Sequence, residues 1–312
     1  MSVSDEASLH WMEVRLLVPE SDLLELEALE QEILAVTPGG FATEAWDAPP
    51  LPGEREPVPV GWTRYLVYVG EHVLEAARLA LSQAVARWPS ATVVASPLDD
   101  GWRERWKQYF KPLRASARFI VAPPWEPVET TGDERLLVIE PAMAFGTAQH
   151  ETTALCLDAV DRIYAAASAR GEAGPDSVCD VGTGTGILAI AAAMLGAKRA
   201  FGNDIDPTAV LAAKDNLRLN PSVQGVGIVF DGTPIGEVTD TFALVIANIL
   251  TPTLIMLSAA IASRVAPGGL LMLSGILAEQ EGEIRQAFEP HGLVHRGTAE
   301  KNGWIRVDFA RA

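Results

Sequence analysis

The sequence has few residues of the kinds that build disulfide or metal frameworks. Its 312 residues include two cysteines, Cys156 and Cys179, and both lie in apolar segments. We therefore expect two buried free thiols rather than a disulfide scaffold. The histidines have no metal-ligand spacing with one another or with the cysteines, so we expect no metal site. They are His10, His72, His150, His291 and His295.

Long hydrophobic runs are also lacking. The longest unbroken apolar run near the centre of the chain, Ile187 to Leu195, is too short to cross a bilayer. The chain starts with MSVSDEASLH, which has neither the basic start nor the apolar stretch of a signal peptide. These two absences lead us to expect a cytoplasmic protein without a membrane segment.

Positive charge is scarce in the first third of the chain. Residues 1–100 hold 17 Asp and Glu against five Arg and no Lys, within a chain whose net charge is −17. Such an acidic module repels phosphate backbones, so we expect no direct contact with nucleic acid. Two interpretations stay open: the charge attracts a basic partner, or it only keeps the protein soluble.

Residues 1–96 have the pattern of a small α+β domain. Alternating apolar residues predict strands at 10–18, 41–46, 62–69 and 91–96, and leucines at helical spacing predict helices at 21–36 and 71–88. The resulting order β-α-β-β-α-β is that of the ferredoxin-like fold. No catalytic cluster is visible in this domain.

Residues 97–135 are interpreted as a linker that contains one aromatic helix. Within 98–112, one helical face carries Trp102, Trp106, Tyr109 and Phe110, and much of the other face is basic. Aromatic residues in such a place can stack on nucleic-acid bases. We favour the alternative, in which this face packs between two domains.

The region 136–312 alternates strands and helices, beginning with LLVIE at 136–140. This alternation is typical of an α/β domain with a mostly parallel sheet and helices on both faces. The final segment, LVHRGTAEKNGWIRVDFA, has the pattern of a hairpin, so we expect the last strand to be antiparallel.

A glycine-rich turn, VCDVGTGTGILAI, starts at Val178 and separates a buried strand from an apolar helix. Gly182, Gly184 and Gly186 allow backbone N–H groups to approach a ligand beyond the carboxyl end of the strand. A dinucleotide loop also fits loosely. However, Asp180 stands two residues before the first glycine, and its carboxylate suits a cation better than a pyrophosphate. The pattern resembles the first motif of class I S-adenosylmethionine-dependent methyltransferases.

Three aspartates follow the next two strands. Asp204 ends a strand, and its carboxylate can accept hydrogen bonds from both ribose hydroxyls of a nucleoside. Asp206 precedes Pro207 and is interpreted first as the N-cap of a helix. Asp231 occupies a position where such folds often contact adenine, although a turn is an equal explanation.

Asn248 lies at the tip of the buried strand ALVIANIL. Its amide oxygen can accept a hydrogen bond from an incoming amine and so orient the nitrogen lone pair for methyl transfer. We therefore predict a catalytic role for Asn248, with a strand-end cap as the alternative. No general base is identified.

Several motifs in one order resemble the ribosomal protein L11 methyltransferases of the PrmA type. They are EPAMAFGTAQHETTALCL (140–157), DVGTGTGILAIAA, NDIDP, ANIL and LSGIL (273–277), and the resemblance covers roughly residues 98–312. It implies S-adenosylmethionine as the cofactor. It also implies cofactor contacts at Phe145, Thr153, Asp180, Gly182, Gly184, Asp204 and Asn248. The chain departs from the family loop at Ala148 and Gln149.

The same resemblance implies a two-domain enzyme that methylates lysine side chains and the α-amine of a basic ribosomal large-subunit protein. An acidic recognition domain would suit that substrate, and we expect a monomer. Three alternatives remain open at this stage: a related methyltransferase with another basic protein or a small molecule as substrate, a non-catalytic S-adenosylmethionine-binding regulator, and a nicotinamide-dependent oxidoreductase.

Overall fold

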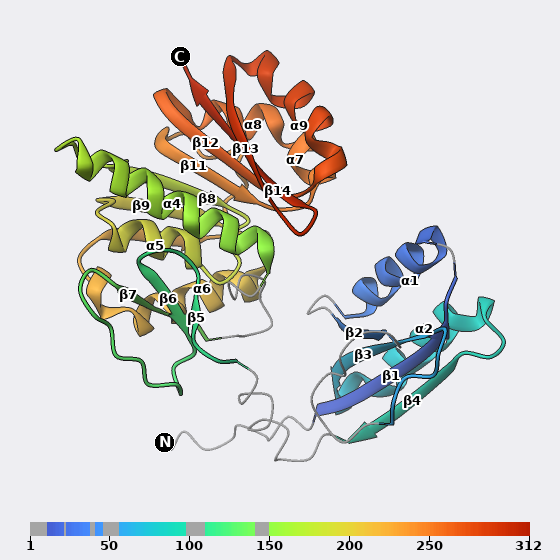
Figure 1. Cartoon of the computed structure of the whole chain (residues 1–312). Coiled ribbons are helices and arrows are strands. Elements are labelled where there is room, and N and C mark those ends of the chain that lie inside the picture. Colours follow the sequence, from blue (N-terminus) through green and yellow to red (C-terminus); the bar gives the residue numbers. More distant parts are fainter. Residues whose placement is uncertain (1–10, 22, 38–40, 46–55, 98–109, 141–149) are drawn as a thin grey trace, which may run out of the picture. The chain divides into compact units, whose positions relative to one another are not determined.

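The computed structural model describes residues 11–21, 23–37, 41–45, 56–97, 110–140 and 150–312 (Figure 1). The chain divides into two compact units, residues 1–109 and 110–312. Each unit has its own hydrophobic core, and the two are described separately below.

The first unit is a four-stranded antiparallel sheet with two helices. Its elements are β1 (Trp11–Pro19), α1 (Leu23–Val36), β2 (Phe41–Ala45), β3 (Trp62–Gly70), α2 (Leu74–Ala84) and β4 (Thr92–Pro97). The sheet order β2-β3-β1-β4 is that of the ferredoxin-like fold, which confirms the prediction. The helix expected at 71–88 begins and ends with 3-10 turns, Glu71–Val73 and Val85–Arg87.

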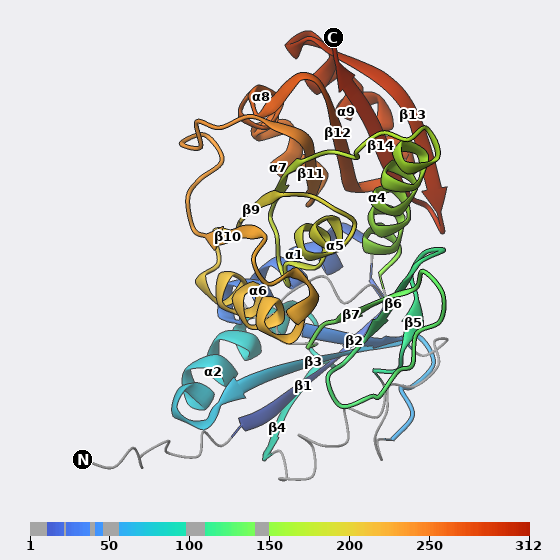
Figure 2. The ribbon, with the colours of Figure 1, turned by 90° about the vertical axis from the view of Figure 1, so that its left-hand side faces the viewer.

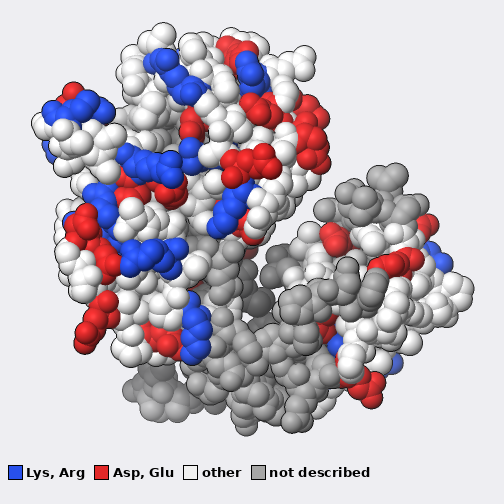
Figure 3. Space-filling view, viewed as in Figure 1, with Lys and Arg blue, Asp and Glu red and all other residues white. Residues whose placement is uncertain are grey.

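Alternation along β1 explains how the first unit is packed. Val14, Leu16 and Val18 are fully buried and belong to one hydrophobic cluster with Leu29 and Ile33 of α1. On the face in view in Figure 3, the charged side chains on the described surface of this unit are more often acidic than basic, whereas the second unit shows acidic and basic side chains interspersed.

A seven-stranded sheet forms the centre of the second unit. Its strands are β8 (Ser177–Val181), β9 (Arg199–Asn203), β10 (Gly227–Asp231), β11 (Phe242–Asn248), β12 (Val265–Leu277), β13 (Leu293–Lys301) and β14 (Trp304–Arg311). The order is β10-β9-β8-β11-β12-β14-β13. Neighbours from β10 to β12 are parallel, and β14 is antiparallel to both of its neighbours. The expected α/β fold with an antiparallel last strand is thereby confirmed.

Helices cover both faces of this sheet (Figure 2). One cluster contains side chains of α4 (Glu151–Ala169), α5 (Ile187–Met194) and α6 (Pro207–Leu219). The other contains side chains of α7 (Thr251–Met256), α8 (Ser258–Ser263) and α9 (Glu281–Phe288). Helices α7 and α8 follow each other directly, with Leu257 between them. Short 3-10 turns lie at Pro221–Val223, Ala278–Gln280 and Glu289–His291.

The last two strands form the predicted hairpin. Lys301 pairs with Trp304, so the loop consists of Asn302 and Gly303. Both have positive φ, 51° and 80°. Asn-Gly is the preferred pair for a two-residue turn with this backbone, because its twist matches that of the flanking strands.

A small sheet precedes the seven-stranded one. It consists of β5 (Leu113–Arg114), β6 (Phe119–Ala122) and β7 (Arg135–Val138). The strand expected at 136–140 therefore belongs to this sheet and not to the large one. Residues 110–135, which were expected to form part of a linker, lie in the second unit. The expected aromatic helix lies almost wholly outside the described residues.

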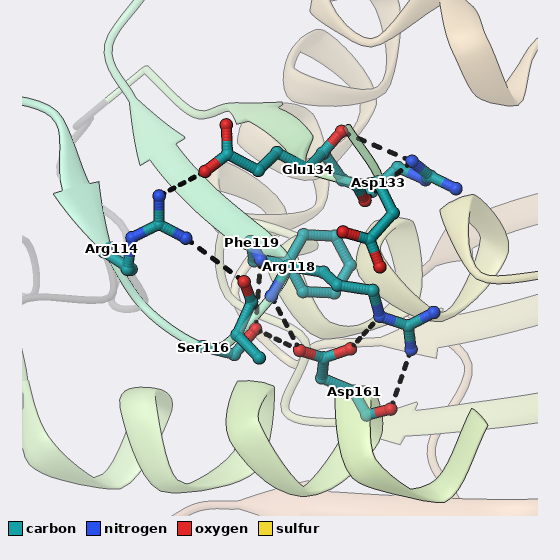
Figure 4. A network of polar contacts seen from close by, with 9 residues as sticks. Arg114, Ser116, Arg118, Phe119, Asp133, Glu134 and Asp161 are labelled. Carbon is teal, nitrogen blue, oxygen red and sulfur yellow. Dashed lines mark hydrogen bonds and ion pairs between the residues drawn. The ribbon is translucent and has the colours of Figure 1, made fainter. Parts of the chain in front are cut away.

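Asp161 of α4 connects the helix to the small sheet through hydrogen bonds and an ion pair (Figure 4). Its carboxylate accepts hydrogen bonds from Ser116 Oγ at 2.6 Å and from the Arg118 backbone N–H at 3.0 Å, and it forms an ion pair with the Arg118 guanidinium. Burial alone would raise the pKa of Asp161, but these contacts outweigh burial and leave it below its usual value. Helix α4 thus holds β6 in place.

Both cysteines are free and buried, as predicted. Burial raises the pKa of Cys156 to about 12 and also raises that of Cys179, so neither thiol is a ready nucleophile. Within the described residues, no helix is long and apolar enough to span a bilayer. The same residues contain no group of three or more His, Cys, Asp and Glu side chains that could hold a metal ion.

Candidate functional site

The glycine turn connects β8 to α5 at the carboxyl edge of the parallel strands. Gly182, Gly184 and Gly186 have φ values of 69°, 52° and 79°, a region that other residues rarely occupy. A Cβ on Gly182 would lie 2.4 Å from Ile249 Cγ2. A Cβ on Gly186 would lie 2.9 Å from the Phe230 ring. The turn therefore requires glycine for its backbone and for its lack of side chains.

Asp204 holds this turn in place from the tip of β9. Its Oδ2 accepts a hydrogen bond from the Gly184 N–H at 3.0 Å, and its Oδ1 accepts one from the Asp206 N–H at 3.1 Å. A carboxylate has about four lone-pair sites, so each oxygen can accept one further hydrogen bond. Asp204 is half-buried and can thus shape the turn and bind hydroxyl groups at once.

Asp180 lies beneath the same turn and is 1% exposed. Thr183 Oγ1 donates to its Oδ2 at 2.8 Å. Burial raises the pKa of Asp180 to about 7, and the charge on Asp204 adds to this effect; the hydrogen bonds from Thr183 and the Ala189 N–H act in the opposite direction. Because the carboxyl group is covered, any effect on a ligand acts through the turn or through its charge.

Asn248 and Thr153 meet at the same edge, although 95 positions separate them in the chain. Asn248 Nδ2 donates to Thr153 Oγ1 at 3.3 Å, and both side chains are buried. Asn248 Oδ1 is buried without a hydrogen-bond partner in the described structure. A buried acceptor that lacks a partner costs free energy, so it marks a place for a donor supplied by a ligand.

The first turn of α4, which carries Thr153, is held from two directions. His150 caps the helix, and its ring packs edge-on against Trp304 with centroids 5.0 Å apart. At the tip of the β13–β14 hairpin, Asn302 Nδ2 donates to Glu151 Oε1 at 3.0 Å. The hairpin therefore fixes the place of Thr153 relative to the strand tips.

Asp206 and Asp231 have the structural roles expected as alternatives to ligand binding, namely a helix N-cap and a turn residue. Asp206 is the N-cap of α6, and its Oδ1 accepts from the Thr208 N–H at 2.8 Å, which confirms the preferred interpretation. Asp231 Oδ1 accepts from the Thr233 N–H at 2.9 Å in a turn after β10. Its contact with adenine stays a prediction.

Phe145, together with Ala148 and Gln149, lies outside the described residues. The predicted cofactor contact of Phe145 and the effect of the two loop departures remain predictions. The other predicted site residues, namely Thr153, Asp180, Gly182, Gly184, Asp204 and Asn248, lie in or next to the loops at the carboxyl edge of β8, β9 and β11 or at the adjoining start of α4.

Sequence reasoning missed Asn203, the last residue of β9. Its backbone oxygen accepts hydrogen bonds from the N–H groups of Gly182 and Thr183, each at 2.9 Å. Its side-chain Oδ1 is buried and has no partner among the described residues. In the sequence, Asn203 could have been identified as a site residue only from its place at a strand end directly before Asp204.

These features fit S-adenosylmethionine. The backbone of the turn is partly exposed at Gly182. Asp204 offers acceptors for ribose hydroxyls. Asn248 Oδ1 has no hydrogen-bond donor among the described residues. Ligands of such sheets bind at the carboxyl ends of the strands, where these residues lie. The strand order and this site define a class I methyltransferase with S-adenosylmethionine as cofactor.

Comparison with known proteins identifies the family. The family model for ribosomal protein L11 methyltransferase (PrmA) matches residues 68–312. The chain therefore belongs to the ribosomal protein L11 methyltransferase family. This result confirms the resemblance and the cofactor inferred from the sequence, and it removes the nicotinamide-dependent alternative.

Individual relatives agree with the family model. The chain is 44% identical over 197 residues to the ribosomal protein L11 methyltransferase of Geotalea daltonii, a match that covers 62% of each chain. The corresponding protein of Pelobacter propionicus is 39% identical over 224 residues, with 70% of each chain covered. A solved ribosomal protein L11 methylase from Lactobacillus delbrueckii subsp. bulgaricus matches with a TM-score of 0.56 and 29% identity, over 65% of this chain and 99% of that one.

Proposed function

We propose that this protein transfers methyl groups from S-adenosylmethionine to lysine side chains and the α-amine of ribosomal protein L11. The observation that carries the proposal is the buried Oδ1 of Asn248 beside Thr153, which has no hydrogen-bond partner among the residues that the structure describes. An amine brought to this edge would supply the missing N–H donor. The relatives in the same family are named for methylation of ribosomal protein L11.

The chemistry requires a neutral amine that is held in line with the transferred methyl group. When bound, S-adenosylmethionine supplies an electrophilic methyl group on a sulfonium. Asn248 Oδ1 accepts one N–H of the incoming amine and thereby orients its lone pair. Thr153 Oγ1 accepts from the Asn248 Nδ2 and so holds the amide with Oδ1 pointing away from Thr153.

A lysine amine has a pKa of about 10.4 in water, so it must lose a proton before transfer. The buried surroundings of Asn248 favour the neutral form, because desolvation disfavours the charged ammonium. We assign no general base to this step. Orientation and desolvation are the contributions we propose for the chain itself.

The acidic first domain is the part we propose for substrate recognition. Residues 1–100 have 17 acidic side chains and five basic ones, which suits a basic protein partner. A cytoplasmic location and a monomeric state belong to the same proposal, since the substrate is a ribosomal protein and a single chain contains every site residue named above.

Methylation of purified ribosomal protein L11 tests the proposal. The protein and labelled S-adenosylmethionine would be incubated with unmethylated L11, and the product would be analysed by mass spectrometry. We expect mass increases of whole methyl groups on lysines and on the α-amine, and far less product in the same time with the Asn248→Ala variant. Label on a different basic ribosomal protein but not on L11 would contradict the proposed substrate. Binding of S-adenosylmethionine without transfer to any basic protein would favour a regulator.

A further inference from the structure

The outer edge of β7 is paired by side chains of a helix rather than by another strand. The Asn220 amide both accepts from the Val138 N–H at 2.9 Å and donates to the Val138 oxygen at 2.7 Å. One turn earlier on α6, Asn216 Oδ1 accepts from the Glu140 N–H at 2.9 Å. These amides satisfy strand-edge groups that would otherwise lack partners.

Asn216 makes a second contact that Asn220 lacks. Its Nδ2 donates to the backbone oxygen of Thr185, in the glycine turn, at 3.0 Å. Asn216 is 1% exposed and Asn220 is 2% exposed, so neither amide can exchange its partners for bulk water. A single buried amide thus joins the glycine turn to the backbone at Glu140.

Close packing of α6 against the glycine turn restricts the position of the Asn216 amide. A Cβ on Gly186 would lie 3.0 Å from the Cβ of Ala213, which precedes Asn216 by about one turn of α6. The same helix begins at Pro207, directly after Asp206, whose N–H donates to Asp204. Helix α6 therefore contacts the glycine turn at Thr185 and Gly186, and its N-cap residue, Asp206, donates to Asp204, which in turn holds Gly184.

We propose that Asn216 is a positioning residue for cofactor binding, acting through the carbonyl of Thr185. It holds the second half of the glycine turn while Asp204 holds the first half through Gly184. Only a side chain with both a donor and an acceptor can join Thr185 O and Glu140 N–H, which is why an amide is required. The inference rests on the proposed function only for the identity of the cofactor.

The test compares Asn216→Ala with Asn220→Ala in the full chain. Asn216 lies in α6 and Asn220 is its C-cap, so both variants remove a buried amide, and both should lower the melting temperature. We expect Asn216→Ala to weaken binding of S-adenosylhomocysteine, measured by calorimetry, about five- to tenfold, and Asn220→Ala to change it less than twofold. Equal affinities in the two variants would overturn the proposal.

Amide hydrogen exchange of the cofactor-free proteins supplies a second readout. We expect faster exchange in the peptide that contains Gly184 and Thr185 for Asn216→Ala and unchanged exchange there for Asn220→Ala. If Asn216→Ala does not fold, Asn216→Asp keeps the acceptor for Glu140 and loses the donor to Thr185, and the same two outcomes apply. Failure to methylate L11 would refute the proposed substrate and leave both of these readouts intact.

Discussion

Asp204 and Gly184, which lie on different loops, are joined by a hydrogen bond of 3.0 Å from the Gly184 N–H to the Asp204 carboxylate. The residue predicted to bind the ribose is therefore also part of the scaffold of the glycine turn. Because one carboxylate has both tasks, its removal should affect the ligand directly and through the turn. This double role makes Asp204 the most informative position in the site.

Asp204→Ala should weaken the binding of S-adenosylmethionine by about 1.5–3 kcal/mol, the usual cost of losing hydrogen bonds to a charged group. Calorimetry measures this directly. Asp206→Ala is the matched control two residues further on. It removes the N-cap of α6 and should cost about 1 kcal/mol of stability with little change in affinity. Unchanged affinity in Asp204→Ala would remove this residue from the site.

Gly182→Ala should reduce cofactor affinity and stability together. The new Cβ would lie 2.4 Å from Ile249 Cγ2 at a φ of 69°, which combines a clash with backbone strain. Strain of this kind costs about 1–3 kcal/mol. Gly171→Ala is the control, since Gly171 has a φ of 71° and no atom within 4 Å of its added Cβ. If the two variants lose the same stability and bind the cofactor alike, the close approach at Gly182 has no functional consequence.

The buried carboxyl of Asp180 should make stability depend on pH. Its folded-state pKa, raised from 3.8 to about 7 mainly by burial, means that the folded protein retains a proton that the unfolded chain releases. The resulting stabilisation is complete below about pH 4 and is lost as the pH rises toward 7. Asp180→Asn cannot ionise, so its free energy of unfolding should fall less between pH 5 and 7.5. Urea unfolding at several pH values measures this change. An equal fall in the free energy of unfolding of the two proteins over that pH range would contradict this account.

Asn248→Ala should lower the turnover of methyl transfer far more than it lowers cofactor affinity. Without the Asn248 oxygen the amine is no longer held in line with the methyl group. A misplacement of about 1 Å costs about 10²-fold in rate. Steady-state kinetics with L11, combined with calorimetry, separates the two effects. Thr153→Ser keeps the hydroxyl that holds the Asn248 amide and should stay close to the parent rate. A rate loss that merely matches the loss of cofactor binding would refute a role of Asn248 in orientation.

Removal of residues 1–109 should leave cofactor binding intact and abolish methylation of L11. The second unit has two hydrophobic clusters of its own, formed entirely by residues after position 110, so it should fold alone. Thermal unfolding and calorimetry check the fold and the site, and mass spectrometry checks the product. Full-rate methylation by the truncated protein would show that the acidic domain does not dock the substrate.

The fold could be predicted because its signals are local. The alternation of Val14, Leu16 and Val18 and the apolar run of ALVIAN need no knowledge of distant residues. The strand at 136–140 was predicted to belong to the large sheet, and that prediction was wrong. Its apolar pattern indicates a strand but does not indicate which strands it pairs with. The side-chain amides of Asn216 and Asn220 that complete its edge lie about 80 positions away.

By itself, the sequence determined the class of the protein, because the glycine turn, Asp204 and Asn248 stand at strand ends, and parallel strands bring such ends to one edge. Only the tertiary structure decided what those residues do to one another. It buried Asp180 beneath the turn and used Asn216 to join two loops. It also placed Asn248 Oδ1 beside Thr153 with no partner in the part of the chain that the structure describes. Burial and unmet hydrogen bonds are properties of packed neighbours, and no local pattern encodes which neighbours a side chain will have.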